Sequence, residues 1–182
     1  SNLERMGVTN ALVLNESTAR VAAAFPAFFD KILVDAPCSG EGMFRKEPDM
    51  VKSWDAEMLA FCRSEQAKIL EACAPMLKAG GMLLYSTCTF APEENEGTVL
   101  HFLERHPEIT RVALYLDNDL AGRVNARKIK ALLKSDQRFS KIRVSVNPPR
   151  SGKDYNEKLQ RTLQAIREEK HASRQKQAAV SI

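Results

Sequence analysis

Two cysteines, Cys38 and Cys88, each stand in a polar loop that ends an apolar run of residues. The first run, residues 31–34, leads into Asp35, and the second covers residues 82–86. The carboxyl ends of parallel strands meet along one edge of a sheet, where ligands bind, so we expect both thiols and this carboxylate at one edge. Thiols gathered there indicate nucleophilic chemistry rather than packing.

The motifs around the two cysteines are long enough to identify. Residues 35–42 read Asp-Ala-Pro-Cys-Ser-Gly-Glu-Gly, and residues 86–89 read Ser-Thr-Cys-Thr. They resemble motifs four and six of the Nop/Sun-type RNA (cytosine-5) methyltransferases, the class that acts on 16S rRNA or tRNA. The resemblance covers residues 1–109 and includes Pro-Glu-Glu-Asn-Glu at residues 92–96. Residues 2–8, which read Asn-Leu-Glu-Arg-Met-Gly-Val, also belong to it.

The resemblance implies methyl transfer from S-adenosylmethionine to C5 of cytosine in RNA through a covalent adduct. Cytosine C5 is a poor nucleophile, and addition of a thiolate at C6 makes it enamine-like. In the resembled family, the residue matching Cys88 attacks the base and the one matching Cys38 helps to remove the C5 proton. The match for Asp35 holds the base edge and assists protonation of the ring.

Other contacts also follow from the resemblance. It implies that Asn15, Asp35 and Pro37 contact S-adenosylmethionine, and that Arg45 and Lys46 contact RNA, although the two cations equally fit a solvated pair. The glycine-rich cofactor loop and the acid that would hold the ribose hydroxyls do not occur in this sequence. We therefore expect an incomplete cofactor site, completed by a missing N-terminal segment or by another chain, including a second copy in a homo-oligomer.

The second part of the chain resembles the C-terminal half of a Toprim domain. The similar residues are Leu-Asp-Asn-Asp-Leu-Ala-Gly-Arg at 116–123 and Gly-Lys-Asp-Tyr-Asn-Glu at 152–157, within a segment of about residues 110–160. In a Toprim domain such acids bind Mg²⁺, but the upstream glutamate is missing and Asp-Asn-Asp before a helix is also a good N-cap. We expect Asp119 to cap a helix, and we expect no metal site.

Charge and composition agree with a division of the chain. Residues 1–109 carry 10 Lys and Arg against 16 Asp and Glu, a net charge of −6, whereas residues 110–182 carry 17 against 7, a net charge of +10. Four irregularly spaced cysteines predict no disulfide and favour a reducing cytoplasm. No apolar run is long enough to span a membrane. The expected divisions are a methyltransferase part at 1–109, a Toprim-like part at 110–160 and a basic helical tail at 161–182.

Periodicity predicts alternating strands and helices, which favours parallel βαβ units. We expect strands at 11–14, 31–34, 82–86, 111–116 and 141–146. We expect helices at 17–29, 47–59, 57–77, 93–105 and 120–133 and a basic helix from about residue 154, with residues 78–81 ending the third helix. The predicted fold is a three-layer α/β sandwich with a mostly parallel, partly Rossmann-like sheet. The cysteines Cys62 and Cys73 fall on a helix face and are expected to be buried.

Two alternatives to the enzyme stay open. The basic second half fits a non-catalytic module that binds nucleic acid. A chimera of methyltransferase and Toprim pieces would fold because βαβ units are modular, and its fold alone would say nothing about function.

Overall fold

The computed structural model describes residues 5–44, 47–150, 152–155, 157–166 and 168. The chain divides into two compact units, Ser1–Phe102 and Leu103–Ile182, with the division inside helix α4 (Glu96–Arg105). Within the described ranges, no helix combines the length and the apolar character needed to cross a membrane.

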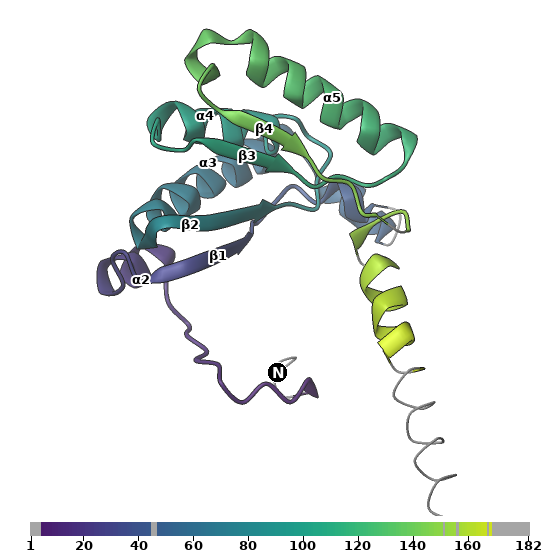
Figure 1. Ribbon diagram of the computed structural model, residues 1–182, viewed down its shortest axis with the longest axis horizontal. Coiled ribbons are helices and arrows are strands. Elements are labelled where there is room, and N and C mark those ends of the chain that lie inside the picture. Colours follow the sequence, from purple (N-terminus) through teal and green to yellow (C-terminus); the bar gives the residue numbers. More distant parts are fainter. Residues whose placement is uncertain (1–4, 45–46, 151, 156, 167, 169–182) are drawn as a thin grey trace, which may run out of the picture. The chain divides into compact units, whose positions relative to one another are not determined.

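The first unit contains one parallel pair of strands (Figure 1). β1 (Phe29–Asp35) pairs with β2 (Leu77–Ser86), and the register places Asp35 opposite Ser86. Both strands therefore end at the same edge, as predicted. The prediction of a strand at residues 11–14 is wrong. This segment pairs with no other described residues, and its large apolar side chains are exposed.

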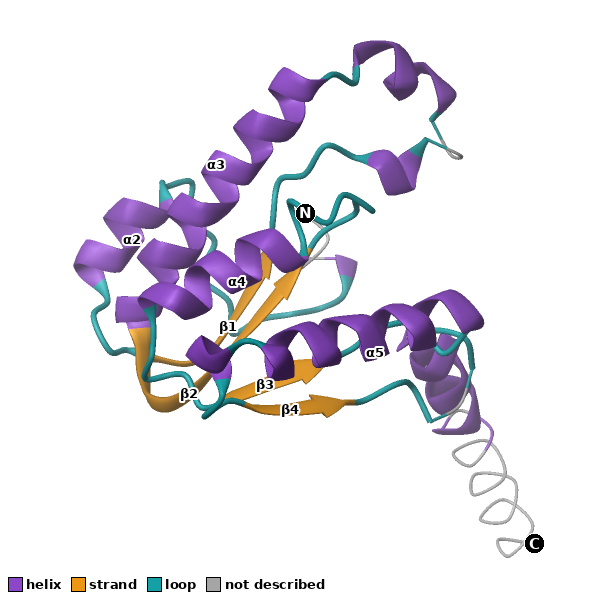
Figure 2. Ribbon diagram, turned by 90° about the horizontal axis from the view of Figure 1, so that it is seen from above, coloured by secondary structure: helices purple, strands orange, loops and turns teal. Residues whose placement is uncertain are grey.

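Helices lie beside this pair, as Figure 2 shows from above. α2 (Thr18–Ala24) is capped by the Ser17 side chain, and α3 (Ala56–Cys73) is capped by Asp55, whose carboxylate accepts from the backbone N–H of Met58 at 2.7 Å. The helix predicted at 47–59 is instead a 3-10 helix, η2 (Pro48–Ser53), because Asp55 starts a new helix. The remaining short turns are η1 (Glu41–Met43) and η3 (Ala74–Met76).

The predicted helix stop at residues 78–81 is wrong, because these residues belong to β2. The helix ends earlier: α3 stops at Cys73, Pro75 stands in η3, and the carbonyls of Pro75 and Met76 accept hydrogen bonds from Ala27 and Phe28. Gly80 adopts a positive φ of 78° inside the strand. The register is irregular between Phe29 and Lys31, opposite this stretch.

The second unit is a parallel βαβ arrangement. β3 (Arg111–Leu114) pairs with β4 (Arg143–Val146), and α5 (Leu120–Ser135) and η4 (Gln137–Phe139) connect them. Ala126, Leu133 and Phe139 are buried between these elements. The predicted strands and helix are confirmed within a few residues of their ends. Described residues from 155 to 168 are helical, as expected for the start of the basic helix.

The α/β class and the parallel pairing are confirmed, but the described strands do not join one mostly parallel sheet. They form two separate sheets of two strands each. In the first sheet only one face is covered. The side chains of Leu33, Met82 and Leu84 point to the other face and are 50 to 68 % exposed. Apolar residues left in water on a strand pair indicate a sheet face that lacks its covering layer.

Candidate active site at the cysteine edge

The two predicted cysteines lie side by side at the carboxyl ends of β1 and β2. Their Cα atoms are 6.3 Å apart and their sulfurs form a disulfide. The two loops diverge only after the ladder, because the backbone N–H of Ala36 still bonds to the carbonyl of Ser86 at 2.9 Å. The expectation of no disulfide is therefore wrong. Spacing along the sequence did not suggest this pairing, which arises because two parallel strands deliver their ends to one edge.

Backbone contacts hold the two cysteine loops together. The N–H of Cys88 points to the Cys38 sulfur at 3.2 Å, and the N–H of Gly42 donates to the carbonyl of Cys88 at 2.9 Å. A Cβ atom on Gly42 would stand 2.4 Å from that carbonyl oxygen. Only a glycine allows the loops to approach this closely.

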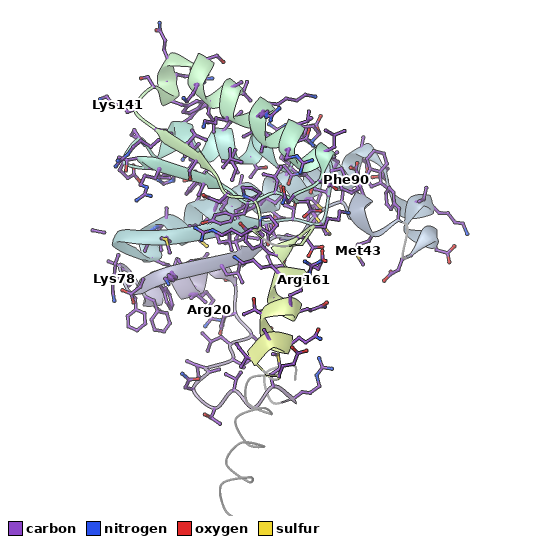
Figure 3. All side chains as sticks on the ribbon, turned by 45° about the vertical axis from the view of Figure 1, so that its right-hand side comes forward. Arg20, Met43, Lys78, Phe90, Lys141 and Arg161 are labelled. Carbon is purple, nitrogen blue, oxygen red and sulfur yellow. A yellow bond between two sulfur atoms is a disulfide. The ribbon has the colours of Figure 1, made fainter. Side chains whose placement is uncertain are left out.

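The predicted carboxylate shares the same edge. Asp35 is exposed, and its Oδ1 accepts from the Ser86 hydroxyl at 3.3 Å. Cys88 is exposed, and Cys38 is half-buried behind it. Phe90, two residues beyond Cys88 and labelled in Figure 3, is 79 % exposed. The exposed side chains at this edge and in the loop that follows it thus include Cys88, Asp35 and Phe90.

A buried carboxylate lies beneath this edge. Glu94 is fully buried, and its side chain accepts from the backbone N–H of Ser39 at 3.1 and 3.3 Å. The Gln66 amide donates to the same carboxylate at 2.6 Å and to the carbonyl of Pro37 at 2.8 Å. No described cation forms an ion pair with Glu94. Hydrogen bonds from the Cys38 loop and from α3 therefore replace the water that a buried carboxylate would lose.

Further hydrogen bonds extend this network to the Cys88 loop. The Thr98 hydroxyl donates to the side-chain amide oxygen of Gln66 at 3.2 Å. The hydroxyls of Ser39 and Thr89 are 3.1 Å apart. The Tyr85 hydroxyl donates to the backbone carbonyl of Glu94 at 2.8 Å, and burial raises the pKa of Tyr85. A buried network with satisfied partners fixes one geometry. Here it fixes the distance between the two cysteine loops.

Sequence reasoning did not assign roles to Glu94 and Gln66. Glu94 lies in the Pro-Glu-Glu-Asn-Glu stretch at residues 92–96, but its burial depends on tertiary packing. Gln66 carried a usable signal, because it falls on the buried stripe of α3 with Cys62, Leu70 and Cys73. A polar residue on an apolar stripe indicates a buried hydrogen bond.

The other predicted site residues are placed differently. Asn15 is exposed in an extended segment before α2, and the strand that was to present it is absent from the described structure. Arg45 and Lys46 lie outside the described residues. Of the three predicted cofactor contacts, only Asp35 and Pro37 therefore stand at the cysteine edge.

The remaining cysteines pack as predicted. Cys62 and Cys73 are buried on α3 and carry free thiols. Burial raises the pKa of both thiols, which favours the neutral, unreactive form.

The acids of the second unit act as helix caps. The Asp119 carboxylate accepts from the backbone N–H of Gly122 at 2.8 Å, and Asp154 accepts from the N–H of Glu157 at 2.7 Å. The Lys153 ammonium lies 3.6 Å from Asp119. The predicted capping role is confirmed. Among the described residues, no group of three or more potential ligands stands ready to hold a metal ion.

Comparisons with known proteins agree with the geometry. A model of the 16S rRNA methyltransferase RsmB/F family matches residues 1–154. Ribosomal RNA small subunit methyltransferase F is 41 % identical over 108 residues in Citrobacter koseri and 40 % identical in Escherichia coli O157:H7. These matches cover 59 % of this chain and 22 % of each relative, so the matched segment spans about a fifth of their length.

Part of this chain also resembles part of a solved structure. The crystal structure of PH0851 superposes with a TM-score of 0.55 at 32 % identity, covering 58 % of this chain and 24 % of that one. Because the family model matches well over half of the sequence, the chain belongs to the 16S rRNA methyltransferase RsmB/F family.

Proposed function

We propose that this chain carries the catalytic thiols of an RNA (cytosine-5) methyltransferase that acts on ribosomal RNA. The observation that supports this most strongly is the contact between Cys38 and Cys88 at one strand edge, with Asp35 on the same edge. The relatives that match this chain are ribosomal RNA small subunit methyltransferases. We place the activity in the cytoplasm, where cysteines are kept reduced.

The proposed chemistry uses each thiol for one step. With the disulfide reduced, the Cys88 thiolate forms a bond to C6 of cytosine while Asp35 holds the base edge and assists protonation of the ring. S-adenosylmethionine, when bound, supplies the methyl group that becomes attached to C5. Cys38 takes the C5 proton, the C6–S bond breaks, and the electron pair returns to the Cys88 sulfur.

The chemistry of the thiol sets the state of the target base. A thiolate adds to C6 from above the plane of the ring, and neighbouring bases cover that face of a cytosine in a helical stack. We propose that the base leaves its stack to enter, as in other enzymes that do chemistry on a base. Arg45 and Lys46, which follow the Cys38 motif in the sequence, are proposed to contact the RNA backbone.

The cofactor site is proposed to be completed by residues beyond those described. The bare face with Leu33, Met82 and Leu84 would then lie beneath further elements, giving the three-layer arrangement expected from the sequence. Asn15, Asp35 and Pro37 remain proposed cofactor contacts. For residues 110–160 we propose a Toprim-like βαβ arrangement without a Mg²⁺ site, supported by the parallel β3–β4 pair and by the capping role of Asp119.

Two experiments test the proposal. Titration calorimetry of the reduced chain with S-adenosylmethionine should give saturable micromolar binding, about −8 kcal/mol. Transfer of a labelled methyl group to 16S rRNA should then be lost in Cys88→Ala, with Cys62→Ala as the matched control. Absent cofactor binding together with salt-sensitive RNA binding would instead favour a non-catalytic binding module, the candidate supported by the charge of +10 on residues 110–182.

A further inference from the structure

The second unit has a hollow at the carboxyl ends of β3 and β4. Its volume is about 560 Å³, and its lining includes Tyr115, Asn147, Pro148, Arg150, Tyr155 and Lys158. Ligands in parallel α/β arrangements bind beyond the carboxyl ends of the strands. The proposed methyl transfer uses none of these residues.

Two tyrosines form one wall of the hollow. The rings of Tyr115 and Tyr155 meet edge to face with their centroids 5.6 Å apart. The hydroxyl of Tyr155 donates to the backbone carbonyl of Asn147, which fixes the orientation of that ring. Tyr115 remains 54 % exposed. The exposed Tyr115 ring, which packs against the fixed Tyr155 ring, is a surface on which a nucleic-acid base can stack.

The charges of the hollow are positive. The Lys158 ammonium lies 5.6 Å from the centre of the Tyr155 ring. Arg150 is exposed and forms no ion pair with another described residue. No carboxylate contributes to the lining among the residues the structure describes. Two cations beside an aromatic wall suit a phosphate that adjoins a stacked base.

Neighbouring acids are already engaged. Asp119 accepts from Gly122 and faces Lys153, and Glu157 accepts from the backbone N–H of Lys153 and pairs with Arg161. Among the described residues, these two acids thus pair with cations other than Arg150 and Lys158.

The backbone around the hollow is well supported. The Asn118 side-chain amide donates to the carbonyl of Pro149 at 3.3 Å, and the Asn118 N–H donates to the carbonyl of Lys153 at 2.6 Å. The N–H of Asn147 donates to the carbonyl of Leu114 at 2.8 Å. These bonds join the loop after β3 to the loop after β4, so the hollow exists before a ligand arrives.

We propose that this hollow binds a single-stranded RNA segment, with one base stacked on Tyr115 and the adjoining phosphate held by Arg150 and Lys158. A base with its phosphate occurs in both RNA and DNA, and the choice of RNA rests on the proposed function. The hollow would serve as a second RNA contact, in a different unit from the cysteine edge.

Fluorescence anisotropy with a labelled 12-nucleotide oligouridine tests the proposal on the whole chain. Tyr115→Ala should raise the dissociation constant roughly 5- to 150-fold, the range of one lost stacking contact, while Tyr115→Trp should bind as tightly as the wild type. Arg150→Ala should weaken binding and flatten the salt dependence by about 0.7 in log–log slope. Lys141→Ala removes an exposed cation elsewhere in the unit and is the matched control.

The outcomes separate this proposal from the proposed function. The binding assay contains no S-adenosylmethionine and no step of methyl transfer, so its result stands apart from that of the methylation assay with Cys88→Ala. Unchanged binding by a folded Tyr115→Ala protein would overturn the stacking site. So would equal losses in Arg150→Ala and Lys141→Ala, which would indicate diffuse attraction to the basic chain. Tighter binding of a matched oligothymidine than of the RNA would overturn RNA as the occupant.

Discussion

The cysteine edge of the first unit and the tyrosine hollow of the second occupy the same position on two parallel strand pairs. In the first, the side chains that join the loops are Glu94, Gln66 and Ser39, all buried. In the second, the loops are joined mainly by backbone hydrogen bonds and by half-buried or exposed side chains such as Asn118 and Lys153. The two strand pairs thus share a topology, but buried side chains join the loops of the first and mainly backbone hydrogen bonds join the loops of the second.

The difference matches what each edge is proposed to do. A transfer step that uses two thiols requires a fixed distance between them, and a buried, satisfied network supplies it because every broken bond is costly. A binding surface for a chain of variable sequence needs an accessible aromatic face and nearby cations, which stay in water. We infer that burial of the supporting polar groups separates the catalytic edge from the binding edge.

The largest expected effect comes from removing the buried carboxylate. Glu94→Ala leaves the Ser39 N–H and the Gln66 amide without their acceptor, and we expect a loss of about 1–3 kcal/mol in the free energy of unfolding. The reduced variant should also re-form the Cys38–Cys88 disulfide with oxidised glutathione several times more slowly than the wild type. Denaturant unfolding and timed alkylation measure the two effects.

Glu93→Ala is the matched control, because Glu93 is the exposed neighbour of Glu94. It should leave both quantities unchanged. Wild-type rates of disulfide formation in a folded Glu94→Ala protein would show that the strand ends alone position the thiols.

Two glycines, one in each unit, allow the two strand edges to be compared by the same substitution. An added Cβ would stand 2.4 Å from the Cys88 carbonyl oxygen at Gly42 and 2.1 Å from the Asp117 carbonyl oxygen at Gly122. Because backbone must move in both cases, Gly42→Ala and Gly122→Ala should each cost about 1–3 kcal/mol of stability. Only Gly42→Ala should also slow disulfide formation. In Gly97→Ala the nearest atom would be 3.3 Å away, so this variant controls for helix and loop effects.

Reactivity should divide the four cysteines into two pairs. After reduction, iodoacetamide at pH 8 should modify Cys88 first and Cys38 next. Cys62 and Cys73 should react only as the pH rises further, because burial raises the pKa of their thiols and keeps them protonated. Mass spectrometry of peptides reports the order. Modification of Cys73 at the rate of Cys88 would contradict the burial that underlies the division.

The smallest effect concerns the cap of α5. The hydrogen bond from Gly122 lowers the pKa of Asp119 below its ordinary value, so the charged form stabilises the folded state. This contribution is present above the unfolded-state pKa of about 4 and is lost as the pH falls through the lower folded-state value. Asp119→Asn should therefore lower the unfolding midpoint slightly at pH 7, and the difference should vanish in acid. An equal difference in the unfolding midpoint at every pH would contradict a contribution from the charge of Asp119.

Much of the cysteine edge followed from local sequence. The runs ending at Asp35 and Ser86 are short, apolar and flanked by polar loops, so their strand ends and the meeting of Cys38 with Cys88 were predictable. Asp119 was predictable as a cap for the same reason, since its type and position suffice. The disulfide was not predicted, because the irregular spacing of the four cysteines fits no known disulfide pattern.

Other features depend on tertiary contacts. Residues 11–14 have a strand composition, yet a strand needs a ladder partner and the described residues provide none. Gly80 and Gly81 suggested a helix stop, but the pairing of β1 with β2 draws them into a strand. The role of Glu94 required knowing that α3, α4 and both cysteine loops converge on it. Propensity alone does not contain that information.

We propose that Cys88 attacks the base and that Cys38 allows its release. Denaturing electrophoresis of labelled 16S rRNA, after incubation with reduced Cys38→Ala protein and S-adenosylmethionine, tests both roles at once. We expect a covalent protein–RNA band that is missing from Cys38→Ala/Cys88→Ala. Normal methyl transfer by Cys38→Ala with no trapped band would contradict it.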